Sequence, residues 1–268
     1  MARMATHDTN TRDLGGLGAW ALSLGCAVGW GAFVMPGTLL LPTGGPLGSV
    51  IALCAGAAAM AVIAANLAYL CRSEPEARGI SGLIRRVFGS DHAFLCSWTM
   101  VFAYTAIIWA NATAVVLLYR YLVGPSLQVG YLYQVGGYSV YAGEAAVTLV
   151  IICATGILSL LPARAILAAY VLMALVLVCG TGFLSSCALV AQGAPSQAFT
   201  PPFPPGSNPS LGVLRIFALA PWAFVGFEGV TNASLHEGMK HKRLLYMLLA
   251  GIASATLVYI ATTVLAVL

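Results

Sequence analysis

Residues 14–71, 58 in a row, carry no formal charge. As one straight α-helix this run would measure about 87 Å at about 1.5 Å per residue, whereas the hydrocarbon core of a bilayer is about 30 Å thick. The segment therefore has to cross a membrane more than once. The composition agrees, because 60% of the residues are hydrophobic and 7% are charged, against roughly a quarter charged in soluble domains. We predict an all-α integral membrane protein.

The first turn is predicted at residues 41–46, LPTGGP, because two prolines and two glycines interrupt a helix. The same reasoning along the chain predicts seven membrane-spanning helices. Their ranges are 16–40, 47–70, 93–122, 145–161, 165–190, 211–234 and 244–268.

The connections between these helices predict the orientation, because Lys and Arg are retained on the cytoplasmic side. An N-terminus in the cytoplasm leaves only Arg120 and Arg215 near outer ends. The other basic residues then lie inside: Arg3, Arg12, Arg72, Arg78, Arg85, Arg86, Arg164, Lys240, Lys242 and Arg243. We expect a multi-pass protein of the cytoplasmic (inner) membrane with residues 1–13 as a cytoplasmic tail. The net charge of +4 then reflects topology, and no nucleic-acid partner is expected.

Motifs for enzymes and metals are not found. His236 and His241 are five residues apart, whereas a helical zinc-protease motif needs four. There is no nucleophile elbow, phosphate loop or pair of carboxylates. We therefore expect neither an enzyme nor a metal or other cofactor. The expected partners are the lipid bilayer and a small-molecule substrate, for which the irregular helices below are the reason.

The first predicted helix contains GCAVGWGAFVMPG, residues 25–37, which is rich in residues that weaken helices. Unwound backbone persists at membrane depth where it lines a cavity or binds something. The freed amides of Gly29, Trp30 and Gly31 are then expected to face an anion. As an alternative, Gly25 and Gly29 form a close-packing face for a neighbouring helix.

A second irregular helix contains APWAFVGFEGVTN, residues 220–232, with Pro221, Gly226 and Gly229 in its middle. Interrupted helices in corresponding positions of two halves point to the substrate site of a transporter. Glu228 is the one acidic residue deep inside a predicted span, where a charge costs about 2.5–3.5 kcal/mol. Burial favours the protonated carboxyl group, so Glu228 is a candidate for proton coupling. Alternatively, it only ties this helix to its neighbours.

The segments GCAVGWGAFVMPG, PTGGPLG, EPEARGISGLIRRVFG and PWAFVGFEGVTNASLHEG, in this order, resemble those of the amino acid-polyamine-organocation (APC) superfamily of permeases. The similarity extends over essentially the whole chain. It implies a LeuT-type fold of inverted repeats with discontinuous helices 1 and 6. Residues 14–190 would be the first five-helix repeat, and residues 191–268 would begin the second.

The resemblance also implies residue roles. The substrate carboxylate would meet the amides of Gly29, Trp30 and Gly31. The substrate amino group would meet the carbonyls of Ala27, Trp222 and Val225, which lie on helices 1 and 6. Trp222 would be an aromatic gate and Glu228 the proton-coupling residue.

The chain departs from the family pattern in three places. Trp30 stands where a small residue is usual, and residues 165–190 contain no lysine for proton coupling. The sequence also ends after seven predicted helices, fewer than the family has, so we expect a fragment or a chain that needs a second chain.

We expect an amino acid permease or exchanger that works by alternating access on an amino acid or related amine. Coupling to protons and formation of a homo-oligomer are left open. The second hypothesis is a non-transporting membrane scaffold or partner subunit whose glycines serve helix packing, and an intramembrane enzyme is the third.

Overall fold

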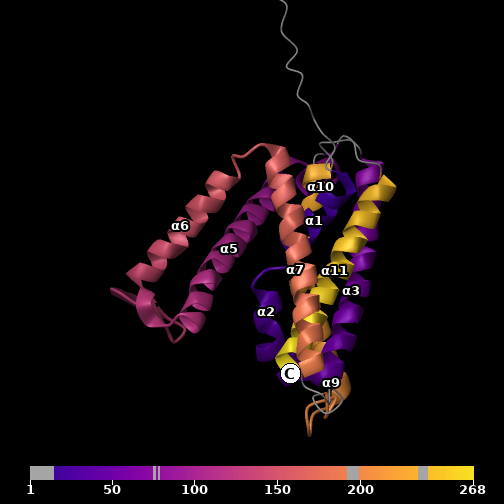
Figure 1. Ribbon diagram of the computed structural model, residues 1–268. Helices are drawn as coiled ribbons and strands as arrows, with labels where there is room; N and C mark the ends of the chain where they lie inside the picture. The colour runs from indigo at the N-terminus through magenta and orange to yellow at the C-terminus, as the bar shows by residue number, and fades with distance from the viewer. Residues whose placement is uncertain (1–14, 75–76, 78, 192–198, 235–240) are drawn as a thin grey trace, which may run out of the picture.

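The computed structural model describes residues 15–74, 77, 79–191, 199–234 and 241–268. Its regular structure is helical except for one two-stranded antiparallel sheet (Figure 1). The predicted tail 1–13 lies outside these residues. The elements are α1 Gly15–Ala27, α2 Gly31–Met35, the π-helix η1 Pro36–Leu40, α3 Leu41–Ser73, α4 Gly79–Phe88, α5 Ser90–Leu122, the 3-10 helix η2 Pro125–Leu127, β1 Tyr131–Val135, β2 Tyr138–Tyr141, α6 Ala142–Leu158, α7 Ala163–Ala191, α9 Pro209–Leu219, the 3-10 helix η3 Ala220–Phe224, α10 Gly229–Ser234 and α11 His241–Val267.

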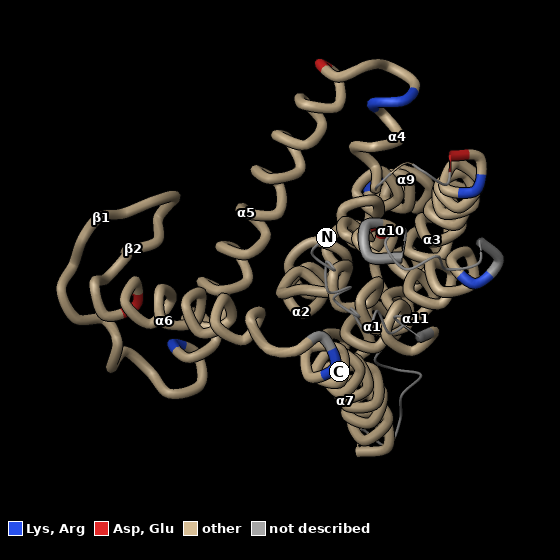
Figure 2. The backbone as a smooth tube through the Cα atoms, turned by 90° about the horizontal axis from the view of Figure 1, so that it is seen from above, with Lys and Arg blue, Asp and Glu red and all other residues tan. Residues whose placement is uncertain are grey.

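Helices long and apolar enough to cross a membrane make up most of the described chain. There are 5 such helices within the described residues, and Gly16–Ala27 and Ala142–Leu158 are shorter apolar helices. The long ones are Gly31–Ser73, Ser90–Leu122, Arg164–Ala191, Pro209–Thr231 and Arg243–Val267. Charged residues lie mainly near helix ends and connections (Figure 2). The chain is therefore a multi-pass membrane protein.

The connection between the first two predicted helices is more compact than the sequence indicates. Two helical segments meet within residues 41–46 at Gly45, whose φ of 67 and ψ of −178 kink the chain, and the Leu47 amide donates to the Pro202 carbonyl at 3.2 Å. Pro46 follows the kink directly, where its missing N–H costs nothing because the first amides of a helix have no intrahelical partner. The predicted six-residue turn is thus reduced to a kink at one glycine.

The core lies among α1, α3, α7, α9 and α11, which pack side by side (Figure 1). Small residues allow close helix contacts: an added Cβ at Gly251 would collide with the Ser23 hydroxyl, and one at Gly56 would collide with Ala220. In lipid such close packing of small residues is a main source of helix association. Buried side chains fill the space between the helices, among them Leu24, Leu53, Phe224, Leu248 and Val258.

α5 and α6 form an antiparallel pair that stands apart from this bundle, with β1 and β2 connecting them at the far end (Figure 1). The sequence analysis leaves this stretch as the connection between the predicted helices 93–122 and 145–161 and predicts no strand there. Gly136 and Gly137 have φ of 55 and 88, the left-handed values that a two-residue hairpin turn requires. The Gly-Gly pair between tyrosine-rich segments is the hairpin signal that a helix-based interpretation misses.

Candidate functional site

The helical backbone is interrupted between α1 and α2. α1 ends at Ala27, and residues 28–30 are not helical before α2 begins at Gly31. Among the described residues, the amides of Gly29 and Gly31 and the carbonyl of Ala27 have no hydrogen-bond partner. In an apolar environment such groups cost free energy unless water or a ligand satisfies them. This break is therefore a potential ligand contact.

A second interruption separates η3 from α10. The 3-10 helix ends at Phe224, residues 225–228 form a turn, and α10 begins at Gly229. Gly226 has φ 103, a left-handed conformation that L-residues other than glycine rarely adopt. In the part of the chain that the structure describes, no group donates to the Val225 carbonyl. The second break thus exposes an acceptor, whereas the first exposes two donors and an acceptor.

The two breaks lie against each other. An added Cβ at Gly226 would collide with the backbone carbonyl of Cys26, the residue before the end of α1. One at Gly229 would lie 3.4 Å from the Cys26 sulfur, and the Ser23 hydroxyl donates to the Phe227 carbonyl at 3.4 Å. The two breaks are therefore neighbours in space, although Ser23 and Phe227 are 204 residues apart in the chain.

Glu228 lies in the second break and binds two donors. Its Oε2 accepts from the Gly226 amide at 3.0 Å, and its Oε1 accepts from the Tyr104 hydroxyl of α5 at 3.3 Å. The residue is half-buried. The carboxyl group thus connects the turn of the second break with a helix outside the bundle.

Asn111 of α5 binds the first break. Its Oδ1 accepts from the Trp30 amide at 2.9 Å, and its Nδ2 donates to the Ile107 carbonyl of its own helix at 2.9 Å. An added Cβ at Gly29 would lie 2.7 Å from this Oδ1, so glycine is needed for the approach. In this conformation the Gly29 and Gly31 amides are open to a ligand, whereas the Trp30 amide is occupied.

The sequence analysis assigns no role to Tyr104 or Asn111. They are seven residues apart, two helical turns, and so lie on the same face of α5. Each contacts one of the two breaks. Two polar residues on one face of an apolar helix are the signal that could have identified them.

The other residues predicted for the site differ in exposure. Ala27 is buried at the end of α1, whereas the Trp222 side chain on η3 is 71% exposed and Val225 is 38% exposed. Only backbone groups are expected to bind the substrate at Ala27 and Val225, so their burial does not decide that role.

Asn111→Ala should destabilise the fold by roughly 1–3 kcal/mol, because it leaves the Trp30 amide without its acceptor. Thermal unfolding in detergent measures the change. Thr99→Val is the matched control, since the Thr99 hydroxyl donates to the Leu95 carbonyl of its own helix α5. Equal stabilities of the two variants would show that the Asn111–Trp30 bond contributes nothing.

Within the described ranges, no group of three or more His, Cys, Asp or Glu residues is placed to hold a metal ion. The site consists of backbone groups, one carboxyl group, one carboxamide and aromatic side chains. Donors and acceptors of this kind recognise a small polar molecule by hydrogen bonding.

Comparisons with known proteins agree with the resemblance noted in the sequence. A family model described as amino acid permease matches residues 14–268. No curated protein and no solved structure matches significantly. The match covers all the helices and both breaks, and it confirms the resemblance to an APC-type permease. The chain therefore belongs to the amino acid permease family, whose members are membrane transporters.

Proposed function

We propose that this chain binds an amino acid between its two helix breaks and moves it across the membrane by alternating access. The observation that supports this most directly is the contact between the breaks at Cys26 and Gly226. The open amides of Gly29 and Gly31 and the open Ala27 carbonyl lie on one side of that contact, and the open Val225 carbonyl lies on the other. An amino acid carries an anionic and a cationic group on one carbon, and it needs both kinds of partner at short range.

The substrate carboxylate binds the amides of Gly29 and Gly31, and the Trp30 amide joins them if Asn111 releases it. The ammonium group binds the carbonyls of Ala27, Val225 and Trp222. The exposed Trp222 indole acts as the gate, because it can swing over an occupied site. The described site contains one carboxyl group, which favours neutral amino acids.

Proton coupling is assigned to Glu228. Its carboxylate accepts from Tyr104 on α5 and from Gly226 in the break, so protonation would weaken both bonds at once. Such a change loosens the connection between α5 and the bundle. A proton can therefore bias the equilibrium between two arrangements of these helices, since it binds one of them more strongly.

The proposed architecture is the LeuT-type fold, with residues 14–190 as the first repeat and residues 191–268 as the start of the second. α1 with α2 and η1, and α9 with η3 and α10, are its discontinuous helices 1 and 6, so the chain crosses the membrane seven times. Arg72, Arg164 and Arg243 are near helix ends that lie together in Figure 1. This supports an N-terminus in the cytoplasm, and placement in the inner membrane is part of the same proposal.

A ligand panel tests the proposal. Purified protein is heated with individual amino acids and amines, because a ligand that binds only the folded state raises its stability by RT ln(1 + [L]/Kd). We expect a selective rise in Tm. Gly29→Ala and Gly31→Ala should abolish it, the first by displacing Asn111 and the second by placing a methyl group beside the open amides.

Gly25→Ala is the matched control in the same segment, because an added Cβ there meets no described atom within 4 Å. It should keep the ligand response. If no compound shifts Tm, or if all three variants respond like the wild type, the substrate site is not between the breaks. The scaffold hypothesis would then be favoured, although the open space at Gly25 does not support the Gly25–Gly29 packing face on which it rests.

A further inference from the structure

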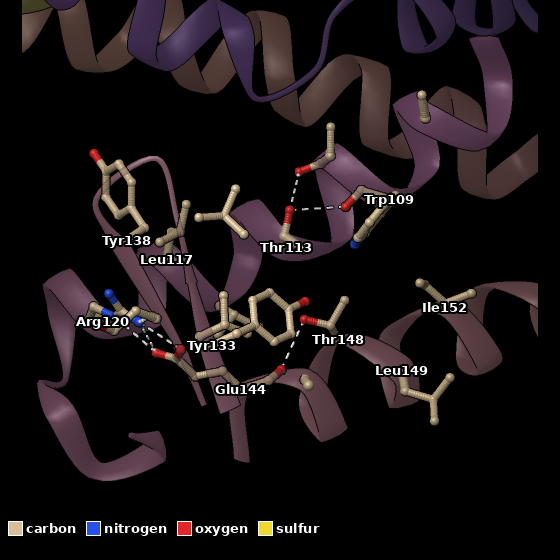
Figure 3. Close-up of a pocket in the computed structure, with 17 residues that line it drawn as sticks. Trp109, Thr113, Leu117, Arg120, Tyr133, Tyr138, Glu144, Thr148, Leu149 and Ile152 are labelled. Atoms are coloured by element: carbon tan, nitrogen blue, oxygen red, sulfur yellow. Dashed lines mark hydrogen bonds and ion pairs between the residues drawn. The ribbon is translucent and has the colours of Figure 1, made fainter. Parts of the chain in front are cut away.

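A cavity of about 710 Å³ lies between α5 and α6, away from the two breaks. The β1–β2 hairpin closes one end, where Arg120 and Glu144 meet, and Trp109 and Ile152 lie toward the other end (Figure 3). Its volume is in the range of roughly 300–1,000 Å³ that small-molecule sites occupy. Neither the sequence motifs nor the proposed transport cycle uses it.

At the hairpin end, the cavity is lined by an ion pair between Arg120 and Glu144. Arg120 Nη2 lies 2.6 Å from Glu144 Oε2, and Arg120 Nε donates to Oε1 at 2.9 Å. The Glu144 side chain is only 9% exposed. Arg120 Nη2 also donates to the Ser139 carbonyl at 3.2 Å. Among the described residues nothing accepts from Nη1 of Arg120, so this guanidinium group can still bind an anion.

Away from the hairpin end, the described lining is mostly apolar, with the Trp109 indole and the hydroxyls of Thr113 and Thr148 as its few polar groups. The Thr113 hydroxyl donates to the Trp109 and Ala110 carbonyls, and the Thr148 hydroxyl donates to the Glu144 carbonyl. The other walls there are apolar side chains such as Leu117 and Leu149. A zwitterionic amino acid would lose more hydrogen bonds to water than these few groups can replace, whereas a hydrocarbon chain needs none.

The depth of the cavity matches one leaflet. From Trp109 to Arg120 the α5 backbone rises about 16 Å, which is close to half of the roughly 30 Å hydrocarbon core. Tyr133 and Tyr138 of the hairpin also line the charged end, and tyrosine is enriched at the level of lipid headgroups. The charged end therefore lies at the membrane surface and the apolar end near the midplane.

We propose that this cavity binds one phospholipid of that leaflet, with an acyl chain between α5 and α6 and the phosphodiester group at Arg120. The Nη1 donors of Arg120 bind a phosphate oxygen while Glu144 keeps the guanidinium plane fixed. A bound lipid would fill the space between two helices that otherwise touch little of the bundle. The proposal needs only a membrane environment and is independent of the substrate site.

A photoreactive lipid tests the acyl-chain position. The full chain is placed in nanodiscs that contain a trace of phosphatidylglycerol with a diazirine near the end of one acyl chain, and labelled residues are mapped by mass spectrometry. We expect severalfold stronger labelling of residues 106–117 and 145–152 than around Met173 and Val176, exposed residues of α7. Equal labelling of all lipid-facing helices would overturn the proposal.

Variants connect this labelling to the cavity. Ala110→Phe combined with Ala145→Phe fills it and should reduce the labelling severalfold. Ala154→Phe on α6, an exposed position outside the cavity, should leave it unchanged. Unchanged labelling in the filled variant would show that the lipid lies elsewhere.

The headgroup position is tested separately with a lipid whose diazirine is in the headgroup. It should label the region around Arg120 and Ser139. Arg120→Leu combined with Glu144→Leu removes the ion pair without leaving an unpaired buried charge, and it should abolish this label while the acyl-chain label persists. Retention of the headgroup label in this variant would overturn the role of Arg120.

Discussion

Gly226→Ala is expected to unfold the region where the two helix breaks meet. Gly226 has φ 103, and a non-glycine residue held in such a conformation costs of order 1–3 kcal/mol. The added methyl group would also collide with the Cys26 carbonyl, so the end of α1 has to move. We expect a loss of at least about 2 kcal/mol from the strain and the displaced contact together.

Thermal unfolding measures the loss of stability, and the ligand panel measures whether the substrate still binds. Gly180→Ala and Gly182→Ala are the controls, because both lie in a long helix, α7, and an added Cβ at either meets nothing within 4 Å in the part of the chain that the structure describes. They should be as stable as the wild type and should keep its ligand response. A Gly226→Ala protein with wild-type Tm and wild-type ligand response would contradict the contact between the breaks.

Glu228→Gln should keep the fold and lose the response to protons. Glutamine retains a carbonyl oxygen that can accept from the Gly226 amide or the Tyr104 hydroxyl, but it cannot bind and release a proton. In liposomes with an inward proton gradient, we expect the variant to show no stimulation of substrate uptake. Substrate binding, measured by the Tm shift, should persist.

Tyr104→Phe separates the effect of the hydrogen bond from that of the carboxyl group. It removes the donor to Glu228 Oε1 but leaves the carboxyl group, so gradient-stimulated uptake should be altered in rate and not abolished. Proton-stimulated uptake by Glu228→Gln at the wild-type rate would exclude Glu228 as the coupling residue. The transport proposal itself would stand if uptake still occurred.

The membrane character and the positions of irregular backbone could be predicted from sequence because both are local properties. A charge-free run of residues 14–71 is too long for one crossing, and clustered glycine and proline weaken a helix wherever it packs. The structure has breaks at residues 28–30 and 225–228, inside the two segments that the sequence analysis selects. Glu228 was also found from local information, since a carboxyl group in an apolar span is unusual.

The partners of these segments were decided only by the tertiary structure. Trp30 and Asn111 are separated by 81 residues, and Tyr104 and Glu228 by 124. A polar side chain on an apolar helix shows that some partner exists, but the helix period does not identify which distant group it meets. The ion pair of Arg120 and Glu144 was missed for the same reason, because its geometry depends on the antiparallel packing of α5 and α6, which no local pattern encodes.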